Sequence, residues 1–273
     1  MTGANQWSQS TQGDRPLDVA LRAARAAADI IVEVYGRAFD VTAKADRSPV
    51  TEADVAAEQA IRETILGAFP DDSIHGEEAG HQAGRSSRTW LVDPLDGTKS
   101  FVRRYPFFST QIALMDREEL ILGVSNAPLF KECAWAVRGN GAELNGERLQ
   151  VSATTNLSEA SLSTGNLKRL AEGAEGWSWQ GLGRIVTEVH RIRGYGDFYH
   201  YHLLAGGKID AVLESDLNIL DIAALTVILR EAGAVVTDLH GHPIGLSTTS
   251  LLATATPELH AEILTRVNAP AKA

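Results

Sequence analysis

Two aspartates stand in the pattern D-x-x-D within WLVDPLDGT, directly after apolar residues that favour a buried strand. An ionised carboxylate away from water needs a partner charge, and Asp93 and Asp96 together need one more strongly. Hard divalent cations such as Mg²⁺ prefer oxygen ligands: carboxylates, carbonyls and water. A D-x-x-D turn after a strand can direct both carboxylates, and the Leu95 carbonyl between them, toward one point. The pattern therefore favours a metal site.

Two further acidic positions extend this constellation. Glu77 lies in GEE at the end of an expected strand, and Asp221 opens an expected helix. Taken singly, such residues are as readily explained as a solvated loop, a turn or a helix cap. Taken together they favour a site in which two metal ions clamp a phosphate ester.

An expected anion site adjoins the aspartates. If a short helix begins at Gly97 and Thr98, its free N–H groups and positive dipole end face the carboxylates, and helix N-termini bind phosphate for that reason. Glycine allows close approach to the backbone, and the Thr98 hydroxyl can orient a water. A metal pocket beside an anion pocket is what a phosphatase needs.

Two helices are expected before this site. Apolar residues recur at helical spacing over Leu17–Tyr35, and Gly36 ends the run. Thr51 is a good N-cap for the second helix, with Asp54 in the position of a capping box, and this helix is expected to reach about Gly67.

Strands and helices follow in alternation. Short turns join the strands expected at Trp90–Val92, Phe108–Met115, Leu120–Asn126 and Glu132–Val137, and GNGAELNGERL predicts a hairpin. A surface helix and loop are expected at 168–183, and a strand, a helix and a strand at 190–215. A helix from Asp221 with Gly233 as its cap, a strand and a last helix at Pro257–Val267 complete the chain. The class is mixed α and β in layers.

Composition excludes several functional classes. The chain has 273 residues and a net charge of −10, which disfavours nonspecific binding to nucleic acid or anionic membranes. Cys133 is the one cysteine, which excludes a disulfide framework, and we expect it to be a small core residue in a reduced intracellular protein. No apolar run approaches the ~20 residues of a membrane span. We expect residues 1–15 to form a flexible tail, and they do not have the pattern of a secretory signal.

With these residues in view, the chain resembles the inositol monophosphatase superfamily of Mg²⁺-dependent, Li⁺-sensitive phosphatases, from about Leu17 to Val267. The superfamily pattern W-[IV]-[IV]-D-P-[IL]-D-G-T is present as WLVDPLDGT. The second pattern, W-D-x-A-A followed by E-A-G-G, is present as LDIAALTVILREAGA, where Leu220 replaces the tryptophan and Ala234 the second glycine. These two replacements predict altered packing at their positions. Asp221 itself is retained, so it is still expected to be a metal ligand.

The resemblance implies an α+β fold, a layered αβαβα sandwich of the inositol monophosphatase / fructose-1,6-bisphosphatase type. Residues 16–155 are expected to form an N-terminal α+β subdomain with the metal and phosphate site. Residues 156–273 are expected to form a C-terminal α/β subdomain that completes the metal and substrate site. A cytoplasmic homodimer acting on a small phosphate ester, with no nucleic-acid or membrane partner, is also implied.

The resemblance also implies roles for individual residues. Two or three Mg²⁺ would be held by the oxygens of Glu77, Asp93, Leu95, Asp96 and Asp221. Asp54 and Thr98, with Glu77, would align and deprotonate the attacking water.

Further residues are implied around the substrate. Gly97, Thr98 and Gly194 would line the phosphate and substrate pocket, and Lys44 would support the third metal from a mobile loop.

Two stretches, FVRRYPFFSTQIAL and RIRGYGDFYHYHLLAGGKIDAVLES, most resemble bacterial histidinol-phosphate phosphatases. Histidinol phosphate carries an ammonium and a titratable imidazole, whereas inositol phosphate is neutral apart from its phosphate. Asp197 and Glu214 can supply two carboxylates for such a cation. The plainer alternatives are a helix N-cap for Asp197 and a surface charge for Glu214.

Three alternatives stay open at this point. The enzyme is an inositol-1-monophosphatase or a broad phosphatase; it uses a covalent aspartate as in haloacid-dehalogenase-type enzymes, although their pattern is D-x-D; or it is a metal-dependent regulatory protein without activity. His190 is expected on a strand, and His200 and His202 on a helix at a spacing that separates their faces, so packing or surface roles are favoured.

Overall fold

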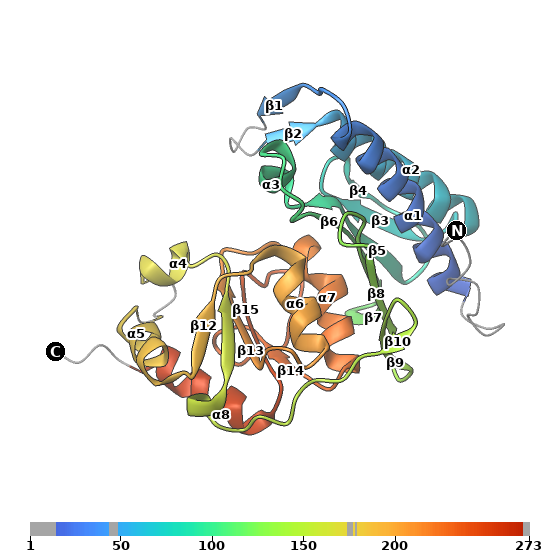
Figure 1. Cartoon of the computed structure of the whole chain (residues 1–273). Helices are drawn as coiled ribbons and strands as arrows, with labels where there is room; N and C mark the ends of the chain where they lie inside the picture. Colours follow the sequence, from blue (N-terminus) through green and yellow to red (C-terminus); the bar gives the residue numbers. More distant parts are fainter. Residues whose placement is uncertain (1–14, 44–48, 174–176, 178, 270–273) are drawn as a thin grey trace. The chain divides into compact units, whose positions relative to one another are not determined.

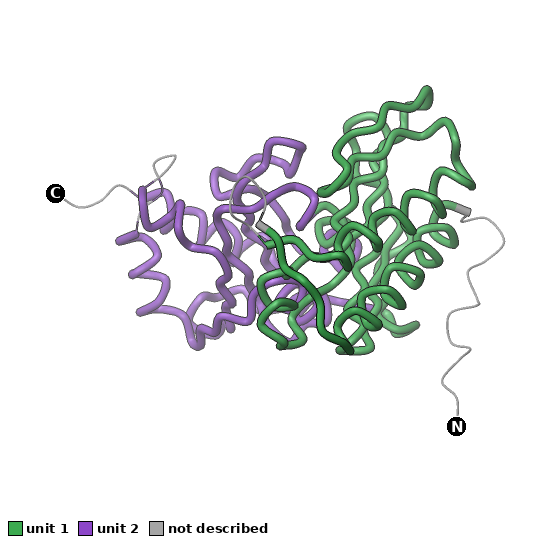
Figure 2. Tube along the Cα trace, turned by 90° about the horizontal axis from the view of Figure 1, so that it is seen from above, with its two compact units in different colours: residues 1–148, 223–228 green, residues 149–222, 229–273 purple. Residues whose placement is uncertain are grey.

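The computed structural model describes residues 15–43, 49–173, 177 and 179–269. The chain divides into two compact units, drawn in different colours in Figure 2. Unit 1 consists of residues 1–148 with 223–228, and unit 2 of residues 149–222 with 229–273. Residues 223–228, in the middle of one helix, therefore belong to unit 1, whereas the residues on either side of them belong to unit 2.

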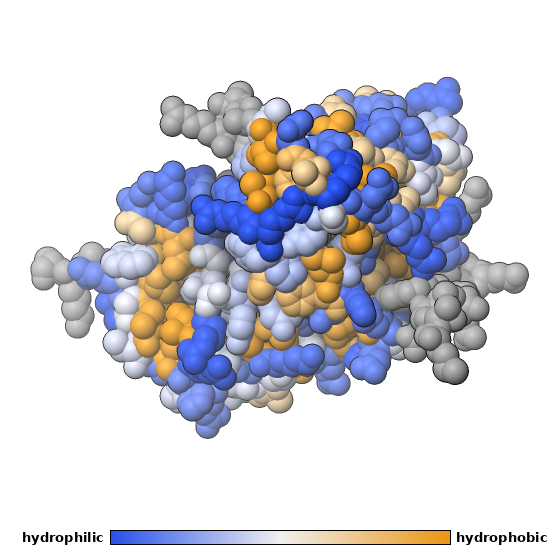
Figure 3. Space-filling view, turned by 45° about the horizontal axis from the view of Figure 1, so that its top comes forward, coloured by the Kyte–Doolittle hydropathy of each residue, from blue (hydrophilic) through white to orange (hydrophobic). Residues whose placement is uncertain are grey.

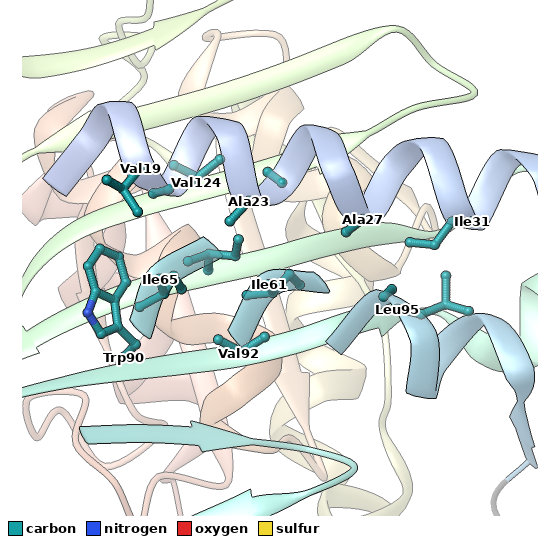
Figure 4. Close-up of a cluster of buried hydrophobic side chains, with 14 of the residues drawn as sticks. Val19, Ala23, Ala27, Ile31, Ile61, Ile65, Trp90, Val92, Leu95 and Val124 are labelled. Atoms are coloured by element: carbon teal, nitrogen blue, oxygen red, sulfur yellow. The ribbon is translucent and has the colours of Figure 1, made fainter. Parts of the chain in front are cut away.

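Two long helices of unit 1, α1 (Arg15–Tyr35) and α2 (Glu52–Ala68), share one hydrophobic core with the eight-stranded sheet (Figure 1). Figure 4 shows members of this shared core, among them Ile31 of α1, Ile61 and Ile65 of α2, and Val92 and Val124 of the sheet. The periodic apolar faces that predict both helices are thus the faces that are buried.

The predicted N-terminus of α2 is confirmed in detail. The Thr51 hydroxyl accepts a hydrogen bond from the Ala53 N–H at 3.1 Å, and the Asp54 carboxylate accepts one from the Thr51 N–H at 2.8 Å. This reciprocal pair is a capping box in which aspartate takes the usual place of glutamate.

Eight strands form the large sheet of unit 1, in the order β10-β9-β8-β7-β6-β5-β3-β4. All neighbours are antiparallel except β3 and β5. The strands are β3 (Ser73–Gly76), β4 (Gly80–Gln82), β5 (Arg88–Asp96), β6 (Ser109–Asp116), β7 (Glu119–Ala127), β8 (Glu132–Val137), β9 (Gly141–Leu144) and β10 (Glu147–Arg148). The expected strands and the hairpin are confirmed. A small β1 (Val41–Ala43) and β2 (Pro49–Thr51) pair and the short α3 (Thr98–Val102) complete the unit.

The other face of this sheet carries small residues. Ala113 pairs with Gly123, and Gly123 pairs with Ala136, so three neighbouring strands present a row of small residues. A Cβ built on Gly123 would lie 2.2 Å from the Ala224 carbonyl oxygen of α7 (Ile219–Glu231). The row therefore allows the middle turn of α7 to lie directly on the sheet.

Unit 2 is built on a five-stranded sheet in the order β12-β11-β13-β15-β14, with β11 parallel to both its neighbours and β15 antiparallel to both of its own. Its strands are β11 (Ser161–Thr164), β12 (Arg191–Arg193), β13 (Ala211–Ser215), β14 (Val235–Thr237) and β15 (Ser250–Thr254). Helices α5 (Trp179–Glu188) and α8 (Pro257–Val267) share a core with one face of this sheet. The 3₁₀ turn η1 (Leu157–Glu159) and the short helix α4 (Lys168–Ala171) also belong to this unit.

Side chains alternate along β13, which places Leu213 in that core and Glu214 on the opposite side, where α6 (Asp197–Ala205) packs. Two expectations need correction. β5 does not end at Val92 but continues through both aspartates, and His190 lies in a bend one residue before β12. His200 and His202 lie on α6 as expected, and both are buried.

Hydrophilic residues predominate on the surface drawn in Figure 3, with apolar residues in smaller areas between them. Within the described parts of the chain, no helix combines the length and apolarity needed to cross a membrane.

Candidate metal and phosphate site

A bulge at the end of β5 brings the two aspartates onto one face. Asp93 pairs with Gln111 and Asp96 with Ser109, so Pro94 and Leu95 together oppose one residue of β6. In a regular strand, residues three apart point to opposite faces, and the extra residue of a bulge reverses that alternation. Carboxylate oxygens of Asp93 and Asp96 consequently lie within 4.8 Å of each other.

Local hydrogen bonds hold this bulge. The Asp93 carboxylate accepts from the Leu95 N–H at 2.9 Å, and the Pro94 carbonyl accepts from the Thr110 hydroxyl at 2.9 Å. Asp93 is buried and Asp96 is half-buried. Two acidic groups at this distance, one of them removed from water, are the arrangement that a cation stabilises.

Asp54 and Thr98 meet although they are far apart in the sequence. The Thr98 hydroxyl oxygen lies 3.0 Å from Asp54 Oδ1 and 3.0 Å from the Leu95 carbonyl. Burial raises the pKa of Asp54 above its ordinary value, against the opposing effect of hydrogen bonds from Thr51 and Thr98. A carboxylate whose pKa is raised in this way is a better proton acceptor than an exposed one.

The predicted short helix is present as α3, which begins at Thr98. Gly97 precedes it with φ 91°, in the left-handed region that favours glycine, and a Cβ there would lie 2.4 Å from the Phe107 carbonyl oxygen. Both the backbone conformation and the close approach of the neighbouring chain therefore require glycine at this position.

Glu77 lies in an exposed turn after β3, where its N–H donates to the Val92 carbonyl of β5 at 3.1 Å. The turn is held by Glu58 of α2, whose buried carboxylate accepts from the Glu78 N–H at 2.7 Å and the Ala79 N–H at 3.0 Å. Arg62 donates to the same carboxylate at 2.7 Å. Sequence reasoning missed Glu58, although a Glu–Arg pair at i, i+4 on the buried face of α2 was a usable signal.

Asp221 lies in the first turn of α7, the helix whose residues 223–228 belong to unit 1. The Asn218 side chain accepts from the Leu220 N–H at 3.1 Å, and the Asp221 carboxylate accepts from the Asn218 N–H at 3.1 Å. Asn218 is therefore the cap of this helix, and Asp221 occupies the third position, as Asp54 does in α2. Leu220, in place of the usual tryptophan, is buried.

In unit 2, the simpler roles considered for Asp197 and Glu214, a helix N-cap and a surface charge, are both wrong. Glu214 is no surface charge, since it is only 3% exposed. Asp197 is not the N-cap of α6, because Gly196 holds that position without a side-chain hydrogen bond. Gly194 lies in the exposed segment before them.

Other singled-out residues have simpler roles. Burial raises the pKa of the Cys133 thiol to about 12, against the effect of Arg25, as expected of an unreactive core cysteine. Lys44 lies outside the described residues.

The donor set fits a hard divalent cation. Within unit 1 it consists of carboxylates and a backbone carbonyl, which are the ligands that Mg²⁺ takes, and it contains no sulfur or imidazole. A cluster of acidic residues that can bind metal is therefore present.

The comparisons with known proteins agree with this geometry. A model of the inositol monophosphatase family matches residues 14–270. The histidinol-phosphatase of Mycobacterium tuberculosis is 39% identical over 253 residues, which cover 89% of this chain and 94% of that protein. The Nus factor SuhB of Pasteurella multocida is 35% identical over 92% of this chain and 95% of its own length.

Among solved structures, the Thermotoga maritima IMPase superposes with a TM-score of 0.82 at 31% identity, over 93% of this chain and 96% of that one. The mixed α and β fold is thereby confirmed, and the haloacid-dehalogenase alternative falls. The chain belongs to the inositol monophosphatase family of phosphoric monoester hydrolases, and the relatives that it resembles include bacterial histidinol-phosphatases.

Proposed function

We propose that this chain hydrolyses L-histidinol phosphate to L-histidinol and phosphate, as a step of histidine biosynthesis. The observation that carries this proposal is its 39% identity to the histidinol-phosphatase of Mycobacterium tuberculosis over 89% of the chain. The segment RGYGDF, with Asp197 at the start of α6, gives the proposal a physical basis, because a carboxylate there suits the ammonium of an amino alcohol.

The proposed metal is Mg²⁺, with two or three ions per chain. We assign the oxygens of Asp93, Asp96 and the Leu95 carbonyl as ligands, together with Glu77 and Asp221. Support comes from the bulge that collects the first two carboxylates and from the hydrogen bonds that fix the Glu77 turn. A divalent cation there would supply positive charge to the phosphate oxygens and to the departing alkoxide.

The chain's own residues orient the attack. The Thr98 hydroxyl and the Asp54 carboxylate, 3.0 Å apart, form the pair that we assign to hold a water and accept its proton. The raised pKa of Asp54 suits that task. Gly97, Thr98 and Gly194 are proposed to line the phosphate and substrate pocket, with the first two residues at the start of α3.

The second candidate is an inositol-1-monophosphatase or a broad phosphatase. The specific observation that favours it is the close superposition on the Thermotoga maritima IMPase. Inhibition by Li⁺, a homodimer and a cytoplasmic location remain proposals that rest on the family resemblance alone.

The test compares kcat/KM for phosphate release, with Mg²⁺, from histidinol phosphate, inositol monophosphate, fructose bisphosphate and an adenosine bisphosphate. We expect histidinol phosphate to lead by about a hundredfold and Asp197→Ala to remove that lead. A lead for inositol phosphate, or similar values for all four esters, would overturn the substrate assignment and leave the metal site untouched.

A further inference from the structure

Buried polar residues open β6, where the strand lies beside the two aspartates. The first three residues, Ser109, Thr110 and Gln111, are fully buried, and the next four are apolar. A buried polar side chain is costly unless its hydrogen bonds are made, so each of the three calls for an account of its partners. Thr110 holds the bulge of β5 through the Pro94 carbonyl, which leaves Ser109 and Gln111 to be explained.

The register of the sheet places these two residues beside the aspartates. Gln111 pairs with Asp93 of β5 and with Ser125 of β7. Ser109 pairs with Asp96 at the other end of the bulge. Directly paired residues of antiparallel strands share one face of a sheet. Gln111 and Ser109 therefore lie on the face that presents both aspartates.

A chain of hydrogen bonds joins Gln111 to Asp96. Gln111 Nε2 donates to the Ser109 hydroxyl oxygen at 2.8 Å and to the Ser125 hydroxyl oxygen at 3.1 Å. The Ser109 hydroxyl in turn donates to Asp96 Oδ2 at 3.3 Å. A hydroxyl carries one proton, and because the Gln111 amide occupies a lone pair of the Ser109 oxygen, that proton is directed to Asp96. The amide thus sets the direction in which Ser109 donates.

The other end of the Gln111 amide has no partner. Gln111 is 0% exposed, and its Oε1 has no hydrogen-bond partner among the described residues. A buried carbonyl oxygen without a donor lowers stability, and an apolar side chain of similar size would avoid that cost. The fold alone therefore does not account for an amide at this position. Its donor end leads, through Ser109, to a carboxylate that we assign as a metal ligand.

We propose that Gln111 is a positioning residue of the metal site, which acts on Asp96 through Ser109. The Ser109 proton holds one oxygen of the Asp96 carboxylate, which fixes the direction in which the other oxygen meets a cation. Residues behind the ligands of a metal commonly set its affinity in this way. This inference rests on the proposed function, because it takes Asp96 to bind Mg²⁺.

The test measures Mg²⁺ binding without any substrate. Calorimetric titration of the metal-free chain with MgCl₂ gives the dissociation constant of the site that Asp96→Asn removes. Gln111→Met keeps the size of the side chain and removes both of its polar ends, and we expect it to raise that dissociation constant about tenfold. Ser109→Ala should raise it by a similar factor. In a Ser109→Ala background, Gln111→Met should add nothing, because the link to Asp96 is already broken.

Thr226→Val is the matched control. Thr226 of α7 is likewise fully buried in unit 1, and its hydroxyl has no partner within the part of the chain that the structure describes. Removing that hydroxyl should leave the dissociation constant of Mg²⁺ unchanged. A second readout is the Mg²⁺ concentration for half-maximal phosphate release from the preferred ester. It should rise with Gln111→Met, while kcat at saturating Mg²⁺ changes less than about threefold.

Three results would overturn the proposal. The first is an unchanged dissociation constant in Gln111→Met, and the second is additive effects of Gln111→Met and Ser109→Ala. The third is a lower Tm of metal-free Gln111→Met without any change in Mg²⁺ binding, since the amide would then serve only the fold. If Gln111→Met does not fold, Ser109→Ala beside Thr226→Val decides alone.

Failure of the proposed function gives a different result. If histidinol phosphate is not the preferred ester, the titration is unaffected, because no ester is present in it. If Asp96→Asn binds Mg²⁺ as the wild type does, the metal assignment falls and this inference falls with it. Loss of binding in Asp96→Asn, with Gln111→Met equal to the wild type, overturns this inference alone.

Discussion

At the scale of single residues, Asp54 and Asp221 share a local device. Both occupy the third position of a helix and accept a hydrogen bond from the backbone N–H of the capping residue. One carboxylate oxygen is thereby fixed by the helix itself, which sets the direction of the other. The cap of α2 was predictable from Thr51 and Asp54 alone, whereas the contact of Asp54 with Thr98 was expected only from the family resemblance, because no local rule joins residues 44 positions apart.

The partners of Glu58 could not be predicted from local sequence patterns. Its hydrogen bonds to the turn after β3 join residues 20 and 21 positions away, and a Cβ on Gly76 would lie 2.3 Å from the Glu58 carboxylate and displace it. The sequence places Glu58 and Arg62 on one helix face but does not say what lies opposite. Packing between segments far apart in the chain decides which residues lie opposite this helix face.

His260 yields a prediction about stability and pH. It is buried in unit 2, its ring nitrogens lie 2.9 Å from the Thr237 hydroxyl and 3.1 Å from the Thr254 hydroxyl, and burial lowers its pKa from 6.5 to about 4. Between these two values the unfolded chain binds a proton at His260 that the folded chain does not, so the contribution of His260 to the free energy of unfolding falls as pH falls from 6.5 to 4.

The measurement is urea unfolding of the wild type and His260→Gln at several pH values across that window. Glutamine cannot take up this proton, so the variant should lose less stability than the wild type on acidification, although it is less stable at neutral pH. Parallel pH curves for the two proteins would show that His260 does not contribute this dependence.

At the scale of elements, periodicity and capping predicted the helices well. α8 begins and ends as expected, with Pro257 in its first turn and Thr256 as its cap, and α1 ends at the turn containing Gly36. Strand ends were harder, because the bulge that extends β5 through Asp93 and Asp96 depends on which residues of β6 lie opposite. The paired strands β1 and β2, of three residues each, were too short to give a pattern.

Two glycines test how elements pack. Gly67, near the end of α2, has open space around a built Cβ, so Gly67→Ala should stabilise the protein by about 0.5–1 kcal/mol through helix propensity. Gly123→Ala meets the Ala224 backbone at 2.2 Å and should destabilise it by about 1–3 kcal/mol.

The measurement is the urea midpoint of each variant beside the wild type, with phosphate release as a second readout. Gly123→Ala should also lower activity, because α7 carries Asp221, whereas Gly67→Ala should leave it unchanged. If Gly123→Ala were as stable as the wild type, α7 would not rest on this row of small residues.

At the scale of the whole molecule, the sequence predicted which consecutive strands pair with each other, but not the order of the strands in either sheet. Short turns predict the run of antiparallel strands from β6 to β9, but not that β3 pairs parallel to β5, nor that β11 lies between β12 and β13. Nor could it show that six residues of α7 belong to the first unit. These arrangements come from packing between segments far apart in the chain.

Net charge and the aspartate pair together predict a response to metal. The chain carries a net charge of −10, and two of its carboxylates are held within 4.8 Å of each other, so without a cation their repulsion opposes folding. Mg²⁺ that binds only the folded chain adds about 2.7 kcal/mol at a hundred times its dissociation constant. For a chain of this size that corresponds to a rise in Tm of roughly 5–10 °C.

Asp96→Asn separates specific binding from general screening. Without Mg²⁺, this variant should melt at or above the wild-type Tm, because the repulsion is relieved. With Mg²⁺ its Tm should rise no more than it does with NaCl at equal ionic strength, and phosphate release should be abolished while the fold is kept. An equal Mg²⁺-dependent rise in both proteins would place the cation elsewhere, since a ligand stabilises the folded chain only through the groups that bind it.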